Sequence, residues 1–115
     1  MEGPAFSQAE IADRITILEL KSEYSAVDIS DEIDWLRRYC LVPLAQMDQL
    51  REINREGWEA VRYVTEHFEK RKVLSDSRII KHCRLAHLSN RKRVVLKNEI
   101  TAALGGHAEY KTWLK

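Results

Sequence analysis

Apolar residues in the first part of the chain recur at the three- and four-residue spacing of an amphipathic helix. Within the stretch EIADRITILELKSEYS and just beyond it, they form two adjacent rows: Ile11, Ile15 and Leu18, and Ile17, Leu20, Tyr24 and Val27. Rows of this breadth predict a helix over about 8–26 that packs against neighbours on two sides. Ser7 and Glu10 have the spacing of a capping box, which marks where this helix begins.

The same periodicity predicts a second and a third helix. Asp28 or Ser30 would cap the second helix, and Pro43 would end or kink it near 41–42 because proline lacks a backbone donor. The third helix would run over about 44–72. Its core side is expected to carry six apolar residues: Leu44, Met47, Leu50, Trp58, Val61 and Phe68.

A fourth helix is predicted over about 77–104. Ser75 or Asp76 would cap its start, and Gly105 and Gly106 would end it, since glycine readily adopts the left-handed conformation that follows many helices. The short aromatic tail beyond it is expected to fold back on the other helices.

Composition agrees with this pattern. The chain has 115 residues, of which 44% are hydrophobic and 32% charged, and it contains only 4 Gly and 2 Pro. That is enough apolar material for one core, and too few turn-forming residues for a β fold. We therefore predict an all-α fold in a single domain, residues 1–115: an antiparallel bundle of three to four helices with two long helices.

Other signals concern the location of the protein and its cofactors. No apolar run approaches the roughly 18–20 residues of a membrane span, and the N-terminus lacks a signal-peptide pattern. Cys40 and Cys83 are isolated, so we expect two buried, reduced thiols in a cytoplasmic protein. Cys83 and His87 have permissible metal-ligand spacing, but two ligands do not make a site. We expect neither a metal nor a cofactor.

Charge is distributed unevenly along the chain. Residues 1–69 carry 7 basic and 15 acidic side chains, a balance of −8, whereas residues 70–97 carry 10 basic and 1 acidic, a balance of +9. The acidic part of the bundle could simply pack beside the basic helix. Alternatively, the basic helix could face an anionic ligand or nucleic acid. Few aromatic residues lie among the cations, so we expect weak or no specific nucleic-acid binding.

Polar residues interrupt the rows that should point inward. One row on the fourth helix is apolar at both ends and polar in the middle: Ile79, Cys83, Ala86, Asn90, Arg93, Lys97, Ile100 and Leu104. Asn54 lies among apolar neighbours on the third helix. On the first helix, Asp13 and Lys21 fall on an inward edge, whereas Thr16, Glu19 and Glu23 fit a solvated face.

Buried charges need partners, so these polar groups should converge. The carboxylate of Asp13 is outnumbered by the cations expected near it, which are Lys21, Arg93 and Lys97. A small anion would balance the surplus. Two other interpretations remain open. The groups could form a salt-bridged layer that only sets helix register, or the long basic side chains could extend to the surface.

Four segments resemble a bacterial family of small helical proteins known as a domain of unknown function. The first is EIADRITILELK at 10–21, and the others are EINREGWEAV at 52–61, SNRKRVVLKNEI at 89–100 and EYKTW at 109–113. The third resembles the family pattern Asn-x-x-Arg-x-x-x-Lys-x-x-Ile. Residues 28–50 and 70–77 depart from it. The resemblance implies an all-helical fold and a gene neighbourhood of glycosyltransferases and surface polysaccharides, but no established activity.

The resemblance and the spacing argument select one set of candidate ligand-binding residues: Asp13, Arg14, Lys21, Asn54, Asn90, Arg93 and Lys97. We expect Arg93 and Lys97 to bind an anion, with Asn54 and Asn90 as orienting hydrogen-bonding groups. The first hypothesis is a non-enzymatic binding or interaction module for a small phosphate- or carboxylate-bearing ligand, such as a nucleotide. The sequence identifies no catalytic residue.

Two other functional hypotheses stay open. One is an enzyme that acts on a phosphorylated or nucleotide-linked metabolite in sugar or envelope metabolism. The other is an oligomeric scaffold, or a binder of the nucleic-acid backbone. Two long helices would leave apolar ends uncovered, so we also predict a homo-oligomer. Those ends carry Phe68, Val73, Leu74, Leu104, Tyr110, Trp113 and Leu114.

Overall fold

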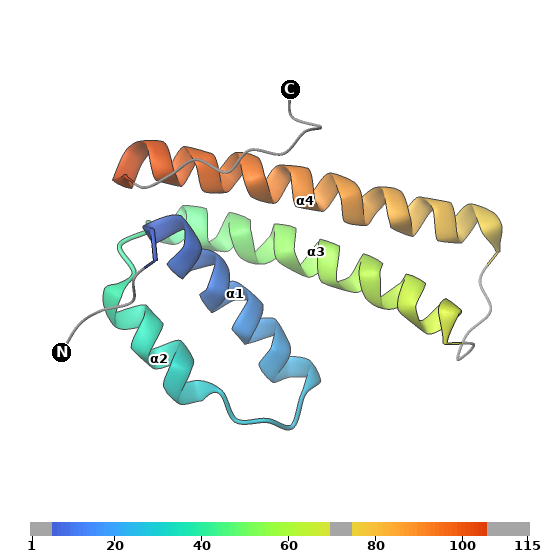
Figure 1. Ribbon diagram of the computed structural model, residues 1–115, viewed down its shortest axis with the longest axis horizontal. Coiled ribbons are helices and arrows are strands. Elements are labelled where there is room, and N and C mark those ends of the chain that lie inside the picture. The colour runs from blue at the N-terminus through green and yellow to red at the C-terminus, as the bar shows by residue number, and fades with distance from the viewer. Residues whose placement is uncertain (1–5, 70–74, 106–115) are drawn as a thin grey trace.

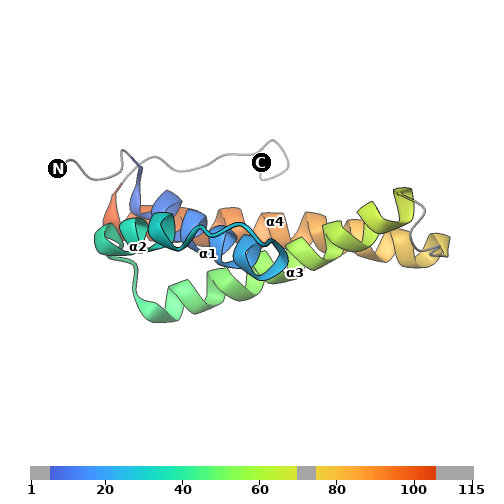
Figure 2. The same ribbon diagram turned by 90° about the horizontal axis from the view of Figure 1, so that it is seen from below.

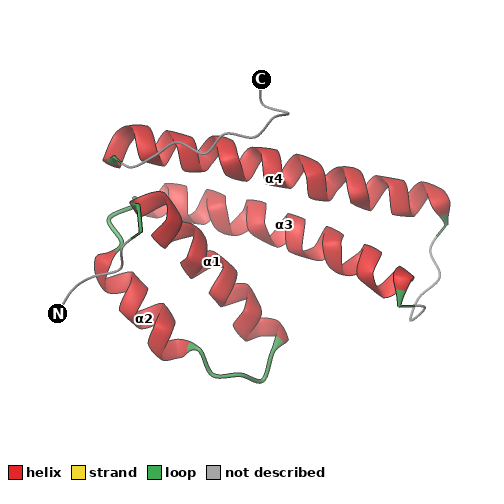
Figure 3. Ribbon diagram, in the orientation of Figure 1, coloured by secondary structure: helices red, strands yellow, loops and turns green. Residues whose placement is uncertain are grey.

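The computed structural model describes residues 6–69 and 75–105, and these residues form four helices (Figures 1 and 3). In chain order the helices are α1 (Gln8–Tyr24), α2 (Ser30–Tyr39), α3 (Leu44–Phe68) and α4 (Asp76–Leu104). No strand occurs within these two ranges. The predicted all-α bundle with two long helices is therefore confirmed.

The helices begin and end close to the predicted positions. The Ser7 hydroxyl accepts a hydrogen bond from the Glu10 amide at 3.2 Å, and the Ser75 hydroxyl accepts one from the Arg78 amide at 3.4 Å. Gly105 has a positive φ of 91°, which explains why glycine follows the last turn of α4. The predictions were too long for two helices, because α1 ends at Tyr24 and α3 at Phe68.

The four helices form three layers. The long helices α3 and α4 form an antiparallel hairpin, α1 packs against both of them, and α2 packs on α1 (Figures 1 and 2). Since α1 has neighbours on two sides, the prediction from its broad apolar rows is confirmed. Gln8 fixes the end of α2, because its amide donates to the Tyr39 carbonyl at 2.9 Å and accepts from the Leu41 amide at 2.6 Å.

The hydrophobic core lies where α1 and α2 meet one end of the hairpin. Its buried residues are Ala9, Ile11, Ala12, Ile15, Leu36, Val42, Met47, Leu50, Leu96 and Ile100. Beyond the end of α1 the hairpin has no such cover within the described residues, so Val61 and Phe68 remain 55% and 72% exposed. The predicted core side is therefore wrong for these two residues, and also for Leu44, which is exposed at the start of α3.

The uncovered part of the hairpin also explains the position of a thiol. Cys83 is exposed and Cys40 is half-buried, so the expectation that both thiols are buried is wrong for Cys83. Cys83 lies on the half of α4 that α1 does not reach. The predicted caps and apolar ends at Gly106, Val73, Leu74, Tyr110, Trp113 and Leu114 lie outside the described residues. None of the helices in residues 6–69 and 75–105 is long and apolar enough to cross a membrane.

The hairpin helices approach each other closely beside the candidate site. A Cβ atom added to Gly57 on α3 would lie 3.2 Å from the Cβ of Ser89 on α4. Ser89 is buried, so the pair of small residues sets the spacing of the two helices at this point.

Replacing Gly57 with leucine should therefore force α3 and α4 apart. Leucine is a good helix former, so any loss of stability reports overpacking and not helix propensity. We expect Gly57→Leu to lower the free energy of unfolding by about 1–3 kcal/mol, measured by urea denaturation. The exposed neighbour Glu59→Leu is the control and should be nearly neutral; equal stability of the two variants would contradict the close contact.

Candidate functional site

The centre of the candidate site is an ion pair between the first and last helices. Asp13 on α1 is only 4% exposed, and Arg93 on α4 meets it through two parallel hydrogen bonds. Arg93 Nε donates to Asp13 Oδ1 at 2.8 Å, and Arg93 Nη2 donates to Asp13 Oδ2 at 2.5 Å. This two-point contact fixes the plane of the guanidinium as well as its position.

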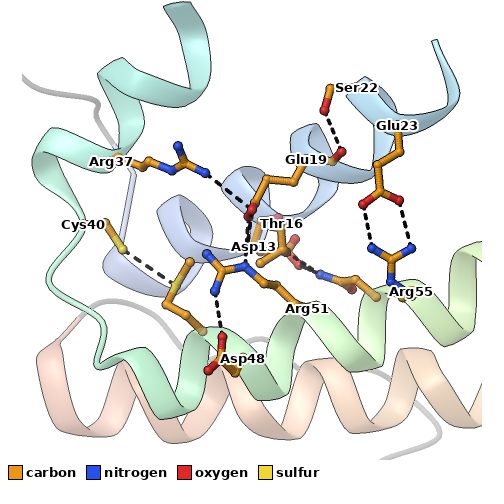
Figure 4. A network of polar contacts seen from close by, with 12 residues as sticks. Asp13, Thr16, Glu19, Ser22, Glu23, Arg37, Cys40, Asp48, Arg51 and Arg55 are labelled. Carbon is orange, nitrogen blue, oxygen red and sulfur yellow. Dashed lines mark hydrogen bonds and ion pairs between the residues drawn. The ribbon is translucent and has the colours of Figure 1, made fainter. Parts of the chain in front are cut away.

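The third helix, α3, completes the ring of donors around the carboxylate. The Asn54 amide on α3 donates to Asp13 Oδ1 at 3.1 Å and to Thr16 Oγ1 at 2.7 Å. The Thr16 hydroxyl in turn donates to the Asp13 carbonyl at 2.8 Å. All three residues are buried, and Figure 4 shows Asp13 and Thr16 together on the side of α1 that faces α3.

A second ion pair lies beside the first one. Lys97 is buried, and its Nζ donates to Glu10 Oε1 at 2.5 Å while lying 3.9 Å from Asp13 Oδ2. Asn90, one turn before Arg93, accepts from Arg93 Nη1 at 3.3 Å. We call the whole set the polar cluster; its members are Glu10, Asp13, Thr16, Asn54, Asn90, Arg93 and Lys97.

These contacts keep the Asp13 carboxylate ionised. Burial, the largest single influence, raises the pKa of Asp13, and the hydrogen bonds and positive charge of Arg93 lower it. The Asn54 hydrogen bond and the charge of Lys97 act in the same direction. The net result is a pKa below the ordinary value of 3.8. At neutral pH Asp13 is therefore an anion that anchors Arg93 and has no proton to donate.

The charge balance of the cluster differs from the prediction. Lys21 is exposed and stays outside, whereas Glu10, expected only as a cap residue, pairs with Lys97. Two carboxylates thus face two cations, and the predicted surplus of positive charge is absent from the polar cluster. The physical reason is that Glu10 lies one turn before Asp13, on the same side of α1.

The structure brings five of the seven predicted site residues together: Asp13, Asn54, Asn90, Arg93 and Lys97. The other two lie apart. Arg14 is exposed, and its guanidinium carbon lies 4.0 Å from the centre of the Phe6 ring. Lys21 borders a smaller apolar pocket of about 300 Å³ near the end of α1.

The sequence argument missed two members of the cluster, Glu10 and Thr16. Thr16 was assigned to a solvated face but is buried, because it lies one turn after Asp13 and one turn before the buried Leu20. That spacing is the signal that could have placed it. Glu19 and Glu23 do lie nearer the surface, where Glu19 contacts Arg51 and Arg37 and Glu23 contacts Arg55 (Figure 4).

An open groove of about 770 Å³ begins at the polar cluster and follows the hairpin past the end of α1. Arg93, Asn54 and Asn90 line it at the cluster. Ile17, Tyr24, Trp58 and Val61 supply apolar walls, and Arg62, Glu66 and Glu69 line it farther along. The rings of Tyr24 and Trp58 are stacked with centroids 5.9 Å apart. The groove thus joins an oriented guanidinium to an aromatic wall.

Comparisons with protein-family models, with characterised proteins and with solved structures find no match to this chain. The resemblance of its segments to the small helical family therefore stays a prediction, and the candidate site is defined by geometry alone.

The ion pair makes a direct prediction about stability. Arg93→Met should leave the buried Asp13 without its main partner and lower the free energy of unfolding by about 2–4 kcal/mol, measured by urea denaturation. This is near the lower end for buried pairs because Lys97 remains 3.9 Å from the carboxylate. Arg55→Met removes an arginine that also makes two bonds to a carboxylate, but at the exposed pair with Glu23, and should change stability little.

Stability should also depend on pH through Asp13. Its pKa is lowered in the folded state, so ionisation stabilises the fold fully above the unfolded value of about 3.8. This contribution is lost as the pH falls through the lower, folded pKa. Urea denaturation between pH 7 and pH 3 should show a steeper loss of stability for the wild type than for Asp13→Asn. Parallel pH profiles would contradict the assignment.

Proposed function

We propose that the protein is a small-molecule binding module whose ligand carries a carboxylate or phosphate at one end and a flat apolar body at the other. The observation that carries the proposal is the guanidinium of Arg93, which Asp13 holds in a fixed plane at the head of the groove. A guanidinium has five N–H donors, so it can bind a protein carboxylate along one edge and offer other donors to a ligand.

The Arg93 side chain is preorganised for anion binding. Its side chain is 30% exposed, so the part of it that lines the groove is accessible from solvent. Because Asp13 and Asn90 already hold the side chain, little rotamer entropy is lost when an anion binds. Asn90 holds Arg93 through its amide oxygen, so its amide NH2 group can donate hydrogen bonds that orient the head group of the ligand.

The rest of the groove suits a flat apolar group. Trp58 lies on α3 where the ligand body would extend, with Ile17 and Val61 as aliphatic neighbours. An aromatic or heteroaromatic ring would stack against Trp58 and bury apolar surface. A nucleotide base is one ring of this kind. The nearby Arg62, Glu66 and Glu69 give the far end of the groove a mixed polar edge.

Charge balance favours one small anion over a polyanion. The two cations of the polar cluster already face Glu10 and Asp13, so the ligand would be held by hydrogen bonds to an oriented donor set and not by a strong positive field. Nucleic-acid backbones bind through accumulated unpaired cations, which this site does not provide. The low pKa of Asp13 likewise favours a positioning role over a role as a general acid.

Binding can be tested with simple probes and NMR spectroscopy. Phenyl phosphate and benzoate carry the proposed features, and benzyl alcohol is the uncharged counterpart. We expect both anions to shift the amide resonances of Gly57 and Ser89 and the indole resonance of Trp58, with millimolar affinity. Benzyl alcohol should bind at least about tenfold more weakly, a difference of about 1.4 kcal/mol.

Two variants separate the site from general charge effects. Arg93→Lys keeps the positive charge but loses the planar fork, and should reduce the preference for the anions. Arg55→Lys makes the same change at an exposed arginine outside the groove and should bind like the wild type. The proposal is wrong if the charged and uncharged probes bind equally, or if the resonances at the groove do not respond to any probe.

A further inference from the structure

A second groove lies on the other face of the hairpin and shares one lining residue, Ile53, with the groove at the polar cluster. It has a volume of about 590 Å³ and is lined by residues of α3 and α4 alone. The lining residues from α3 are Gln49, Glu52, Ile53 and Glu56, and those from α4 are Leu88, Arg91, Lys92, Val95, Leu96 and Glu99. We call this surface the back face.

Helix geometry places the back face opposite α1. Successive residues of an α-helix are rotated by about 100°, so Val95 points roughly 200° away from Arg93, two positions earlier. Leu88 is turned away from Arg93 by a similar amount. Since Arg93 points toward α1, α1 covers neither Leu88 nor Val95, and these two residues remain 40% and 47% exposed.

The back face has a striped arrangement of charge. Its exposed apolar residues, Leu88 and Val95, both lie on α4, where helix rotation places them between Lys92 and Arg91. Glu52 and Glu56 form an acidic edge on α3, and Arg91 and Lys92 form a basic edge on α4. Lys92 Nζ lies 4.0 Å from Glu56 Oε2 in the same chain, which shows that the two edges lie at the same height along the hairpin.

We propose that the back face binds a second copy of this chain, related by a two-fold axis that runs parallel to the hairpin. Rotation about such an axis places α3 of each copy over α4 of the other at the same height. The acidic edge then meets the basic edge twice, and Leu88 and Val95 on α4 of each copy lie against the aliphatic parts of Glu52 and Glu56 on α3 of the other. A two-fold axis perpendicular to the helices would instead stack α3 on α3, with acid facing acid.

Glu99, the one acid that lines the back face from α4, also fits this arrangement. Glu99 is an acid on the basic helix, and it lies nearer the end of α4. Because Glu56 pairs with Lys92 and the helices are antiparallel, the residue of α3 at the height of Glu99 is Gln49. In the proposed dimer the Gln49 amide of one copy faces Glu99 of the other and can donate to it, so this position carries no like-charge repulsion.

The back face is large enough for a specific dimer interface. Helices of 25 and 29 residues at 1.5 Å per residue are about 38–43 Å long, and two adjacent helices are about 20 Å wide. A footprint near 800 Å² per copy is the usual size of a specific protein interface. The product would be a four-helix bundle made from two hairpins, with α1 and α2 of each copy on the outside.

Light scattering after size-exclusion chromatography, across a dilution series, tests the proposal on the full chain. The wild type should reach twice its mass of 13.5 kDa at high concentration. Leu88→Glu combined with Val95→Glu should weaken self-association about a hundredfold or more. Leu104→Glu is the matched control, because Leu104 is 41% exposed on the same helix but points to the side of Arg93, and it should dimerise like the wild type.

Charge reversal tests whether the charged edges of the two copies meet at the interface. One variant carries Glu52→Lys and Glu56→Lys, so both of its edges are basic; the other carries Arg91→Glu and Lys92→Glu, so both are acidic. Each alone should be monomeric through like-charge repulsion, and an equimolar mixture should form a heterodimer. All substituted positions are exposed, and circular dichroism confirms that each variant is helical before mixing.

Three results would overturn the proposal. The wild type could keep a mass of 13.5 kDa at the highest concentration, which excludes self-association. The dimer could survive the Leu88 and Val95 substitutions, which would place the interface elsewhere. The charge-reversed variants could fail to associate on mixing although each is folded, which would show that the charged edges do not meet.

Discussion

The Asp13 carboxylate is the constraint on which the arrangement of the helices depends. A buried charge costs several kcal/mol unless it is paired and hydrogen-bonded, and the partners of Asp13 come from two other helices. Arg93 reaches it from α4 and Asn54 from α3, so the donors converge only when α1 lies at one height and one rotation on the hairpin. The apolar core makes α1 pack there; the carboxylate selects the register.

The groove follows from this register together with the lengths of the helices. α1 has 17 residues, whereas α3 and α4 have 25 and 29, so α1 ends while the hairpin continues. Arg93 lies where the cover of α1 ends, which is why it is buried enough to be fixed by Asp13 and exposed enough to meet a ligand. The same group therefore stabilises the fold and defines the head of the candidate site.

Sequence periodicity could predict this site as far as it depends on single helices. Asn90, Arg93 and Lys97 share an inward row of α4, and Asn54 interrupts an apolar row of α3, so their convergence was predictable. The sequence could not predict which of these inward rows a neighbouring helix covers, because that depends on where the neighbouring helix ends. Lys21 and Val61 lie on otherwise inward rows, but near or beyond the end of α1. Thr16 and Glu10 were missed because a short hydroxyl residue and a residue near a helix cap suit an exposed position as well as a buried one.

The uneven charge along the chain acquires a structural explanation on α4. Arg93 and Lys92 are neighbours in sequence but point about 100° apart around α4, and each meets an acid of a different helix. Arg93 and Lys97 face Asp13 and Glu10 of α1, whereas Lys92 faces Glu56 of α3. These three cations of the basic segment are thus divided between two acidic helices. Charge separation along the sequence becomes charge matching between helices, and on the back face it leaves two parallel edges of opposite sign, an arrangement that is complementary to a rotated copy of itself.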